Sequence, residues 1–273
     1  MIRIIPAVIL LFVFASCSNE NNPDDQPGTR LVKVMDMEDP TDSSYYDRFT
    51  YDNEGRVTEI FSGSFGGILA TFYYNGAGLK PYKMDGEFDE TTHFFEYDAS
   101  GRLIRDSSID AIGGTVYLTT YSYFQGLTVS DSWYEQTGAP RINQERDSFL
   151  LDAGNNVLQA RYYRADDPYG DPSRLTFIEQ FSYDNKVNPL GKLNIAFLKK
   201  YDSHGIFETT LYYEYFQEHN LVKSEYIDYD DVTGIPYPIE TEINSYQYHS
   251  NSYPKEATYA GPGYMGKVLY TYE

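Results

Sequence analysis

Cysteine and histidine are scarce in this sequence, and their scarcity excludes several kinds of site. The 273 residues include one cysteine, Cys17, and four histidines, His93, His204, His219 and His249. A single cysteine cannot form an internal disulfide, and the histidines lack both the His-x-x-x-His spacing and the flanking glutamate of a zinc site. We interpret the histidines as exposed residues at strand ends and turns. We expect neither a metal site nor a cofactor.

Catalytic motifs are also missing. The chain contains no Gly-x-Ser-x-Gly elbow, no phosphate-binding Walker loop and no dinucleotide fingerprint. Two acidic clusters, residues 166–171 and 228–231, lack the spacing of a loop that wraps calcium, so we interpret them as solvated loop charge. We expect no catalytic residues. A glycan hydrolase stays open as an alternative, because two carboxylates close together across a cleft would suffice.

Basic residues are few. Lysine and arginine total 21 against 41 aspartate and glutamate residues, which gives a formal net charge of −20. An acidic surface repels phosphate backbones, so nucleic acid is excluded as a partner. We interpret the excess charge as a means of solubility and of preventing association between sheet edges.

A long hydrophobic run occurs only at the N-terminus, where Arg3 precedes an apolar stretch over residues 4–14. This run is too short to span a bilayer, and it predicts a secretory signal peptide over residues 1–16. Ala15-Ser16-Cys17 resembles a bacterial lipobox, which implies lipidation of Cys17. Residues 17–30 are rich in Asn, Pro and acids and predict a disordered tether.

The acids that follow the cysteine, Glu20, Asp24 and Asp25, resemble the export signal of Bacteroidetes surface lipoproteins. We therefore expect an outer-membrane location, on the periplasmic side or at the cell surface. The N-terminal lipid would be the only contact with the membrane.

Aromatic residues are abundant, with 29 tyrosines and 16 phenylalanines, and many of them recur in one pattern. Phe49-Thr-Tyr-Asp-Asn-Glu-Gly-Arg-Val57 combines strand-forming residues with an Asp and a Gly suited to a tight turn, so it predicts one β-hairpin. Strong or partial copies begin at residues 49, 72, 95, 121, 149, 181, 213, 246 and 270. A repeat at this spacing predicts consecutive hairpins.

Residues 31–273 show no sustained helical periodicity, whereas strand-like alternation recurs, for example over residues 207–215. We predict a single all-β domain, an antiparallel meander of about 16 or more strands. A round barrel of that size would enclose a lumen too wide for side chains to fill. We therefore predict a flattened or incomplete barrel, porin-like in shape but soluble.

Two resemblances follow from these motifs. The Tyr-Asp-x-x-Gly-Arg copies at residues 51–56 and 97–102 resemble the YD repeats of Rhs-type surface proteins. The whole chain resembles a Bacteroidetes lipoprotein family of unknown function with a porin-like fold. Cys17, the hairpins and Phe181-Ser-Tyr-Asp-Asn-Lys-Val-Asn-Pro-Leu190 carry this second resemblance. It implies an architecture and a compartment, but no activity.

Insertion of the strands into a membrane is not expected. Lipid-facing strands need an apolar outer band. Arg161, Arg164, Glu208 and Glu214 put charge along predicted strands instead.

Exposed aromatic residues give the candidate binding site. Trp133, Tyr134, Tyr169 and Tyr237 lie at predicted hairpin tips or in Pro/Gly loops. Aromatic faces with nearby acids and amides suit sugar rings, so we expect a non-enzymatic binding protein for glycans or proteins. The alternatives are that Trp133 packs into the sheet, and that the protein is a structural or assembly lipoprotein with an envelope protein as its partner.

Overall fold

The computed structural model describes residues 28–37, 45–86, 90–110, 115–135, 142–166, 169–200, 216–230 and 233–273. The predicted signal peptide, Cys17 and most of the tether lie outside the described residues. So do His204 and the strand predicted over residues 207–215.

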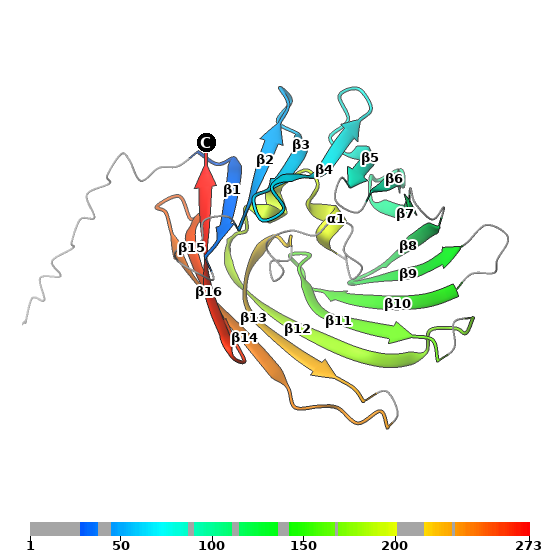
Figure 1. Ribbon diagram of the computed structural model, residues 1–273. Coiled ribbons are helices and arrows are strands. Elements are labelled where there is room, and N and C mark those ends of the chain that lie inside the picture. The colour runs from blue at the N-terminus through cyan, green and yellow to red at the C-terminus, as the bar shows by residue number, and fades with distance from the viewer. Residues whose placement is uncertain are drawn as a thin grey trace, which may run out of the picture.

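Within the described residues, sixteen antiparallel strands form a closed barrel in which each strand pairs with its neighbours in the chain (Figure 1). The strands are β1 (Leu31–Asp36), β2 (Tyr46–Tyr51), β3 (Val57–Ser62), β4 (Gly67–Tyr74), β5 (Pro81–Gly86), β6 (Thr91–Tyr97), β7 (Leu103–Asp110), β8 (Val116–Phe124), β9 (Leu127–Glu135), β10 (Ile142–Leu151), β11 (Val157–Arg164), β12 (Arg174–Val187), β13 (His219–Asp228), β14 (Glu240–Tyr248), β15 (Pro254–Gly261) and β16 (Tyr264–Tyr272). β1 pairs with β16 and closes the ring. The predicted all-β meander is confirmed.

The sequence repeat coincides with the even-numbered strands. Each described copy lies in an even strand, leading toward the turn or connection that follows it; the copy at residue 213 lies outside the described residues. Even strands therefore all run toward one end of the barrel, which we call the turn end. Residues 30 and 273, which exchange two backbone hydrogen bonds, also lie at the turn end.

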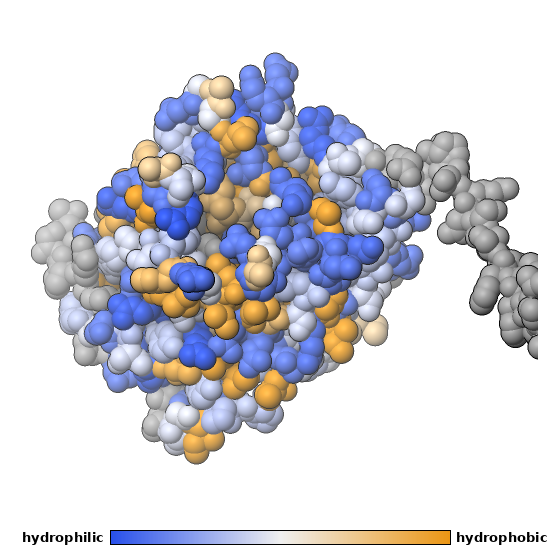
Figure 2. Space-filling view, turned by 180° about the vertical axis from the view of Figure 1, so that it is seen from behind, coloured by the Kyte–Doolittle hydropathy of each residue, from blue (hydrophilic) through white to orange (hydrophobic). Residues whose placement is uncertain are grey.

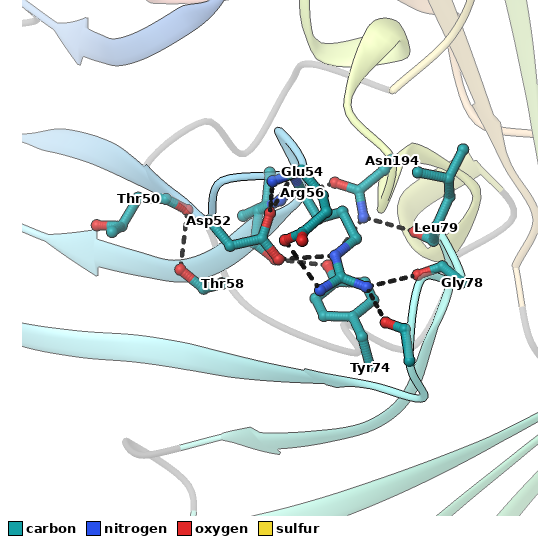
Figure 3. A network of polar contacts seen from close by, with 11 residues as sticks. Thr50, Asp52, Glu54, Arg56, Thr58, Tyr74, Gly78, Leu79 and Asn194 are labelled. Atoms are coloured by element: carbon teal, nitrogen blue, oxygen red, sulfur yellow. Dashed lines mark hydrogen bonds and ion pairs between the residues drawn. The ribbon is translucent and has the colours of Figure 1, made fainter.

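The first turn shows why Asp, Gly and Arg recur at this spacing (Figure 3). Asp52 Oδ1 accepts hydrogen bonds from the backbone N–H groups of Glu54 and Arg56, at 3.0 and 2.9 Å, and Oδ2 accepts from Arg56 Nε at 2.7 Å. Gly55 has a φ of +76°, a conformation that costs glycine little. The Arg56 guanidinium also donates to the carbonyl of Gly78 at 2.9 Å, so the turn is joined to the next hairpin.

Two later turns repeat these contacts. Asp98 accepts from the backbone N–H and the Nε of Arg102, at 2.9 and 2.8 Å. Asp152 accepts from the backbone N–H and the side-chain amide of Asn156, at 2.8 and 2.9 Å. Asn155, with a φ of +69°, takes the place of the glycine.

In every even-numbered strand except β10, a tyrosine near the end of the strand ties it to the preceding strand. Seven such hydroxyls donate to a carbonyl at or near the start of that strand, at distances between 2.5 and 2.9 Å. The pairs are Tyr51 with Leu31, Tyr74 with Val57, Tyr97 with Pro81, Tyr123 with Leu103, Tyr183 with Val157, Tyr246 with Leu221, and Tyr272 with Pro254. These bonds satisfy the phenols in the barrel interior.

The connection between β12 and β13 folds into the barrel at the turn end. We call residues 188–200 and 216–218 the plug; it contains a 3₁₀ helix, η2 (Leu190–Lys192), and a short α-helix, α1 (Ala196–Lys200), which lies inside the ring of strands (Figure 1). Its buried apolar side chains are Leu190, Leu193, Ile195, Ala196, Leu198 and Phe216. They form one cluster with inward-facing residues of the barrel, such as Phe49, Phe72 and Phe95.

Two amide side chains fix the plug to the wall. Asn194 Oδ1 accepts from the backbone N–H of Val57 at 2.9 Å, and its Nδ2 donates to the carbonyl of Leu79 at 2.8 Å (Figure 3). Gln217 Oε1 accepts from the backbone N–H of Val157 at 3.0 Å. Val57 and Val157 each begin a strand just after a repeat turn, where the pairing register shifts.

The prediction of a flattened or incomplete barrel is wrong. The barrel is closed, and the plug and large aromatic side chains occupy much of the interior at the turn end, where a cavity of about 500 Å³ remains beside the plug. The prediction assumed that the strands alone must supply the filling. A connection between two strands supplies it instead.

Candidate functional site

The opposite end of the barrel, which we call the mouth, carries all four predicted binding residues. At the mouth each odd-numbered strand connects to the next even one. Trp133 and Tyr134 lie near the end of β9, while Tyr169 and Tyr237 lie in the connections after β11 and β13 and are 63% and 50% exposed.

A cavity of about 440 Å³ lies at the mouth beside β8, β9 and β10. It is lined by Tyr117, Leu118, Thr119, Ser132, Trp133, Tyr134 and Glu145. The Tyr117 and Tyr134 rings lie 5.8 Å apart, and the hydroxyls of Thr119 and Ser132 are hydrogen-bonded at 2.9 Å. Ser130 is the next inward-facing residue of β9 below Ser132. It is 1% exposed, and its hydroxyl has no hydrogen-bond partner among the described residues.

β9 separates the two residues that the sequence predicted as a pair. Side chains alternate across a strand, and Tyr134 shares the inward face with the buried Ser132. Trp133 lies opposite Leu118 and shares the outer face with Asp131. Its indole N–H donates to Glu135 at 3.3 Å. The cavity therefore offers tyrosine faces as its inward aromatic surface.

A second cavity, of about 880 Å³, lies at the mouth beside β12, β13 and β14. It is lined by Phe177, Tyr226, Asp228, Tyr237, Pro238, Ile239, Glu240 and Pro262. The Tyr237 hydroxyl donates to Asp230 at 2.9 Å, which holds the β13–β14 connection over the cavity edge. Tyr169 lines neither cavity among the described residues.

Beneath the mouth, carboxylates and tyrosines meet in the barrel interior. We call this group the belt; it consists of Asp36, Asp147, Tyr162, Glu179, Tyr226, Glu242, Tyr259 and Tyr264. Its hydroxyls donate to its carboxylates: Tyr162 to Glu179, Tyr264 to Glu242 at 2.7 Å, and Tyr259 to Asp36 at 2.9 Å.

Two glycines make room for the belt. A Cβ atom at Gly266 would lie 2.2 Å from the Tyr259 hydroxyl, and one at Gly261 would lie 2.3 Å from the Tyr264 ring. Each tyrosine thus passes over the neighbouring strand to reach a carboxylate beyond it.

Burial sets the protonation of the belt. It raises the pKa of the Glu242 carboxyl, although hydrogen bonds from Tyr264 and Asn244 oppose the shift. Burial also raises the pKa of the Tyr226 phenol, and the nearby charge of Glu179 raises it further. The raised pKa values keep the phenols of Tyr162 and Tyr226 protonated, so that they can donate hydrogen bonds.

One histidine differs from its prediction. His93 is 6% exposed and lies in the middle of β6, with Nδ1 3.0 Å from the Asp106 carboxylate. The prediction of an exposed histidine is wrong at this position because His93 alternates with Phe95 and Tyr97 on the inward face. That spacing was visible in the sequence.

The outer face carries ion pairs along the strands. Side chains that alternate with buried residues pair as Lys83–Asp85, Arg105–Glu96, Arg146–Asp131, Lys223–Glu225 and Lys267–Glu256, at 2.6 to 3.2 Å. Figure 2 shows one face of the molecule on which hydrophilic residues surround small hydrophobic groups.

Metal and helical membrane signals are absent from the described ranges. There, no group of three or more His, Cys, Asp or Glu side chains is arranged to hold a metal ion. No described helix has the length and hydropathy that a membrane-spanning helix requires.

Solved structures share this architecture. A porin-like protein from Bacteroides vulgatus has a TM-score of 0.58 at 10% sequence identity, over 89% of this chain and 98% of that chain. The fold is porin-like. A porin-like protein from Bacteroides uniformis has a TM-score of 0.49 at 14% identity, over 90% of this chain and 99% of that one. No protein-family model matches the porin-like chain, and no curated protein does.

Proposed function

We propose that this porin-like chain is a lipid-anchored binding protein of the bacterial envelope, which takes its ligand at the mouth of the barrel. The observation that carries the proposal is the aromatic and polar lining of the two cavities at the mouth. The turn end holds the plug, its apolar cluster and a cavity of about 500 Å³ between the plug and the repeat turns. The mouth contains two cavities that are lined by aromatic and polar side chains and are formed by the strands and their connections. Ligand sites in proteins are typically concave and partly aromatic.

Carbohydrate is the ligand class that the β8–β10 cavity favours. Tyr117 and Tyr134 offer ring faces to the apolar side of a sugar, and Thr119, Ser132 and Glu145 offer hydrogen-bonding groups. The unpartnered hydroxyl of Ser130 lies just below and would gain from a bridging hydroxyl or water.

The outer face supports attachment through a lipid rather than through the strands. Paired charges at mid-strand, such as Lys83–Asp85, would lose their hydration in hydrocarbon, which costs several kcal/mol per ion. Lipidation of Cys17 would supply the anchor. The porin-like neighbours come from Bacteroides, which agrees with an outer-membrane location.

An arrangement relative to the membrane follows from this proposal. The tether enters the barrel at residue 30, at the turn end. The lipid would hold the turn end near the bilayer and leave the mouth facing away, either into the periplasm or outside the cell.

A glycan array tests the carbohydrate proposal. Purified protein should give saturating signals that Tyr134→Ala weakens at least about tenfold, because the inward ring is lost. Tyr169→Ala is the matched control, since Tyr169 is an exposed tyrosine at the mouth that lines neither cavity, and this variant should bind like the wild type. A flat response to host and dietary glycans, or equal loss in both variants, would reject this assignment of the site.

A structural or assembly role is the second candidate. Ile235, Tyr237 and Ile239 in the β13–β14 connection are 63%, 50% and 58% exposed, and such a group suits a protein partner. Crosslinking in cells should then capture one defined envelope protein, and Ile235→Ser with Ile239→Ser should abolish the crosslink. Recovery of a monomer alone would count against this role.

A further inference from the structure

The β12–β14 cavity has aromatic walls. Phe177 stacks on Tyr162 of the belt, with ring centroids 3.9 Å apart and planes 6° from parallel. Tyr226 forms the inward wall on β13, and Tyr237 lies at the rim. Rings arranged around one space favour flat apolar groups or cations, because the face of each ring is electron-rich.

The same cavity is strongly acidic. Asp228 and Glu240 line it, and the described lining residues include no lysine, arginine or histidine. Below them, Glu242 is 1% exposed and is hydrogen-bonded to two neutral groups, Tyr264 at 2.7 Å and Asn244 at 3.2 Å. A buried carboxylate held only by neutral donors gains free energy when a cation approaches.

The basic residues on neighbouring strands are already paired. Arg164 on β11 contacts Glu145 at 2.7 Å and Asp147 at 3.3 Å. Arg174 at the start of β12 contacts Asp166 at 2.8 Å. Neither ion pair includes an acid that lines the cavity.

We propose that the β12–β14 cavity binds a ligand that carries an ammonium group. The ammonium lies against the faces of Phe177 and Tyr226, and Asp228 and Glu240 balance its charge. This inference rests on the proposed function, because it specifies the class of ligand that one of the two mouth cavities binds. It distinguishes this cavity from the β8–β10 cavity, where Glu145 is paired with Arg164.

Two pairs of probes that differ in charge test the proposal. The purified protein is titrated calorimetrically with choline and with dimethylbutanol, in which carbon replaces the nitrogen, and with butylamine and butanol. At least one ammonium probe should bind about tenfold tighter than its uncharged counterpart. The double variant Asp228→Asn with Glu240→Gln should lose that selectivity, and both side chains are exposed, so the fold should persist.

The control variant removes two charges from the outer face, Glu59→Gln with Glu96→Gln, and should keep the selectivity. Equal binding of charged and uncharged probes, no binding of any probe, or unchanged selectivity in the Asp228/Glu240 variant would each overturn the proposal. Glycan binding that Tyr134→Ala abolishes, without ammonium selectivity, would leave the proposed function standing and reject only this inference.

Discussion

At the scale of single residues, the aspartate of the repeated turn is the most reused element of the chain. Asp52, Asp98 and Asp152 each accept backbone and side-chain hydrogen bonds from the residue four positions later. Hydrogen bonds from Ser100 and Arg102 lower the pKa of the Asp98 carboxyl. The folded turn thus stabilises the ionised form of the aspartate.

The stability of the barrel should therefore fall in acid. Because the pKa of Asp98 is lower in the folded state than its ordinary value of 3.8, its contribution is present above that pH and is lost as the pH falls below it. Asp98→Asn keeps the turn but removes the charge. Thermal unfolding should show the wild type to be more stable than Asp98→Asn at neutral pH, with the difference shrinking below about pH 4. A difference independent of pH would show that the charge does not matter.

At the scale of elements, the plug explains how a wide barrel keeps an apolar core at one end. Asn194 and Gln217 place amide oxygens on the first backbone N–H of β3 and of β11. Leu190 and Ile195 are fully buried in the same region. Apolar burial holds the plug inside, and the amides fix its orientation.

Loss of one amide should loosen the plug locally. Asn194→Ala leaves the Val57 N–H without its acceptor, which costs about 1–3 kcal/mol. Asn194→Asp keeps an acceptor for Val57 but sets a carboxylate oxygen against the Leu79 carbonyl, so it should lower stability while still protecting the Val57 amide. Hydrogen exchange at the Val57 amide reports on this bond, and unchanged protection in Asn194→Ala would contradict the role of the side chain.

The hairpins could be predicted from sequence, whereas the plug could not. The Tyr-Asp-x-x-Gly-Arg pattern encodes its turn locally, since Asp52 bonds residues only two and four positions away. α1 is five residues long and shows no helical periodicity, and its apolar side chains find their partners on strands distant in sequence. Closure likewise depends on pairing residues 31–36 with residues 268–272, which no local pattern signals.

The candidate site was predictable in part. The sequence predicted Trp133 and Tyr134 near a hairpin tip and Tyr169 and Tyr237 in Pro/Gly loops, and all four positions lie at the mouth. That these positions share one end of the barrel depends on the strand order, which no single hairpin reveals. The belt escaped prediction because its contacts, such as Tyr259 with Asp36, join residues at opposite ends of the sequence. Aspartate and glutamate are also too common in this chain for any of them to be singled out.

At the scale of the whole molecule, the two ends of the barrel differ in structure. The turn end contains the repeat turns, the plug with a cavity beside it, and residues 30 and 273. The mouth contains the two cavities of the proposed binding sites. The outer face between them carries ion pairs. Under the proposed function, attachment and binding would take place at opposite ends of the barrel.

The proposed anchor gives a direct test at this scale. Cys17→Ser removes the thiol that would be acylated and should move the protein from the membrane fraction to the soluble fraction. Circular dichroism should show unchanged strand content, because Cys17 precedes β1. Retention of the Cys17→Ser protein in the membrane fraction would argue for contact through another part of the chain.

The seam between β1 and β16 has one more consequence. Because Arg30 and Glu273 exchange backbone hydrogen bonds in both directions, a short linker could join them without disturbing the sheet. The ring of hairpins then has no intrinsic starting point, and a circular permutant could be opened at another repeat turn, for example after Gly101. The new termini would lie at the same end of the barrel, so a permuted chain should fold to the same structure.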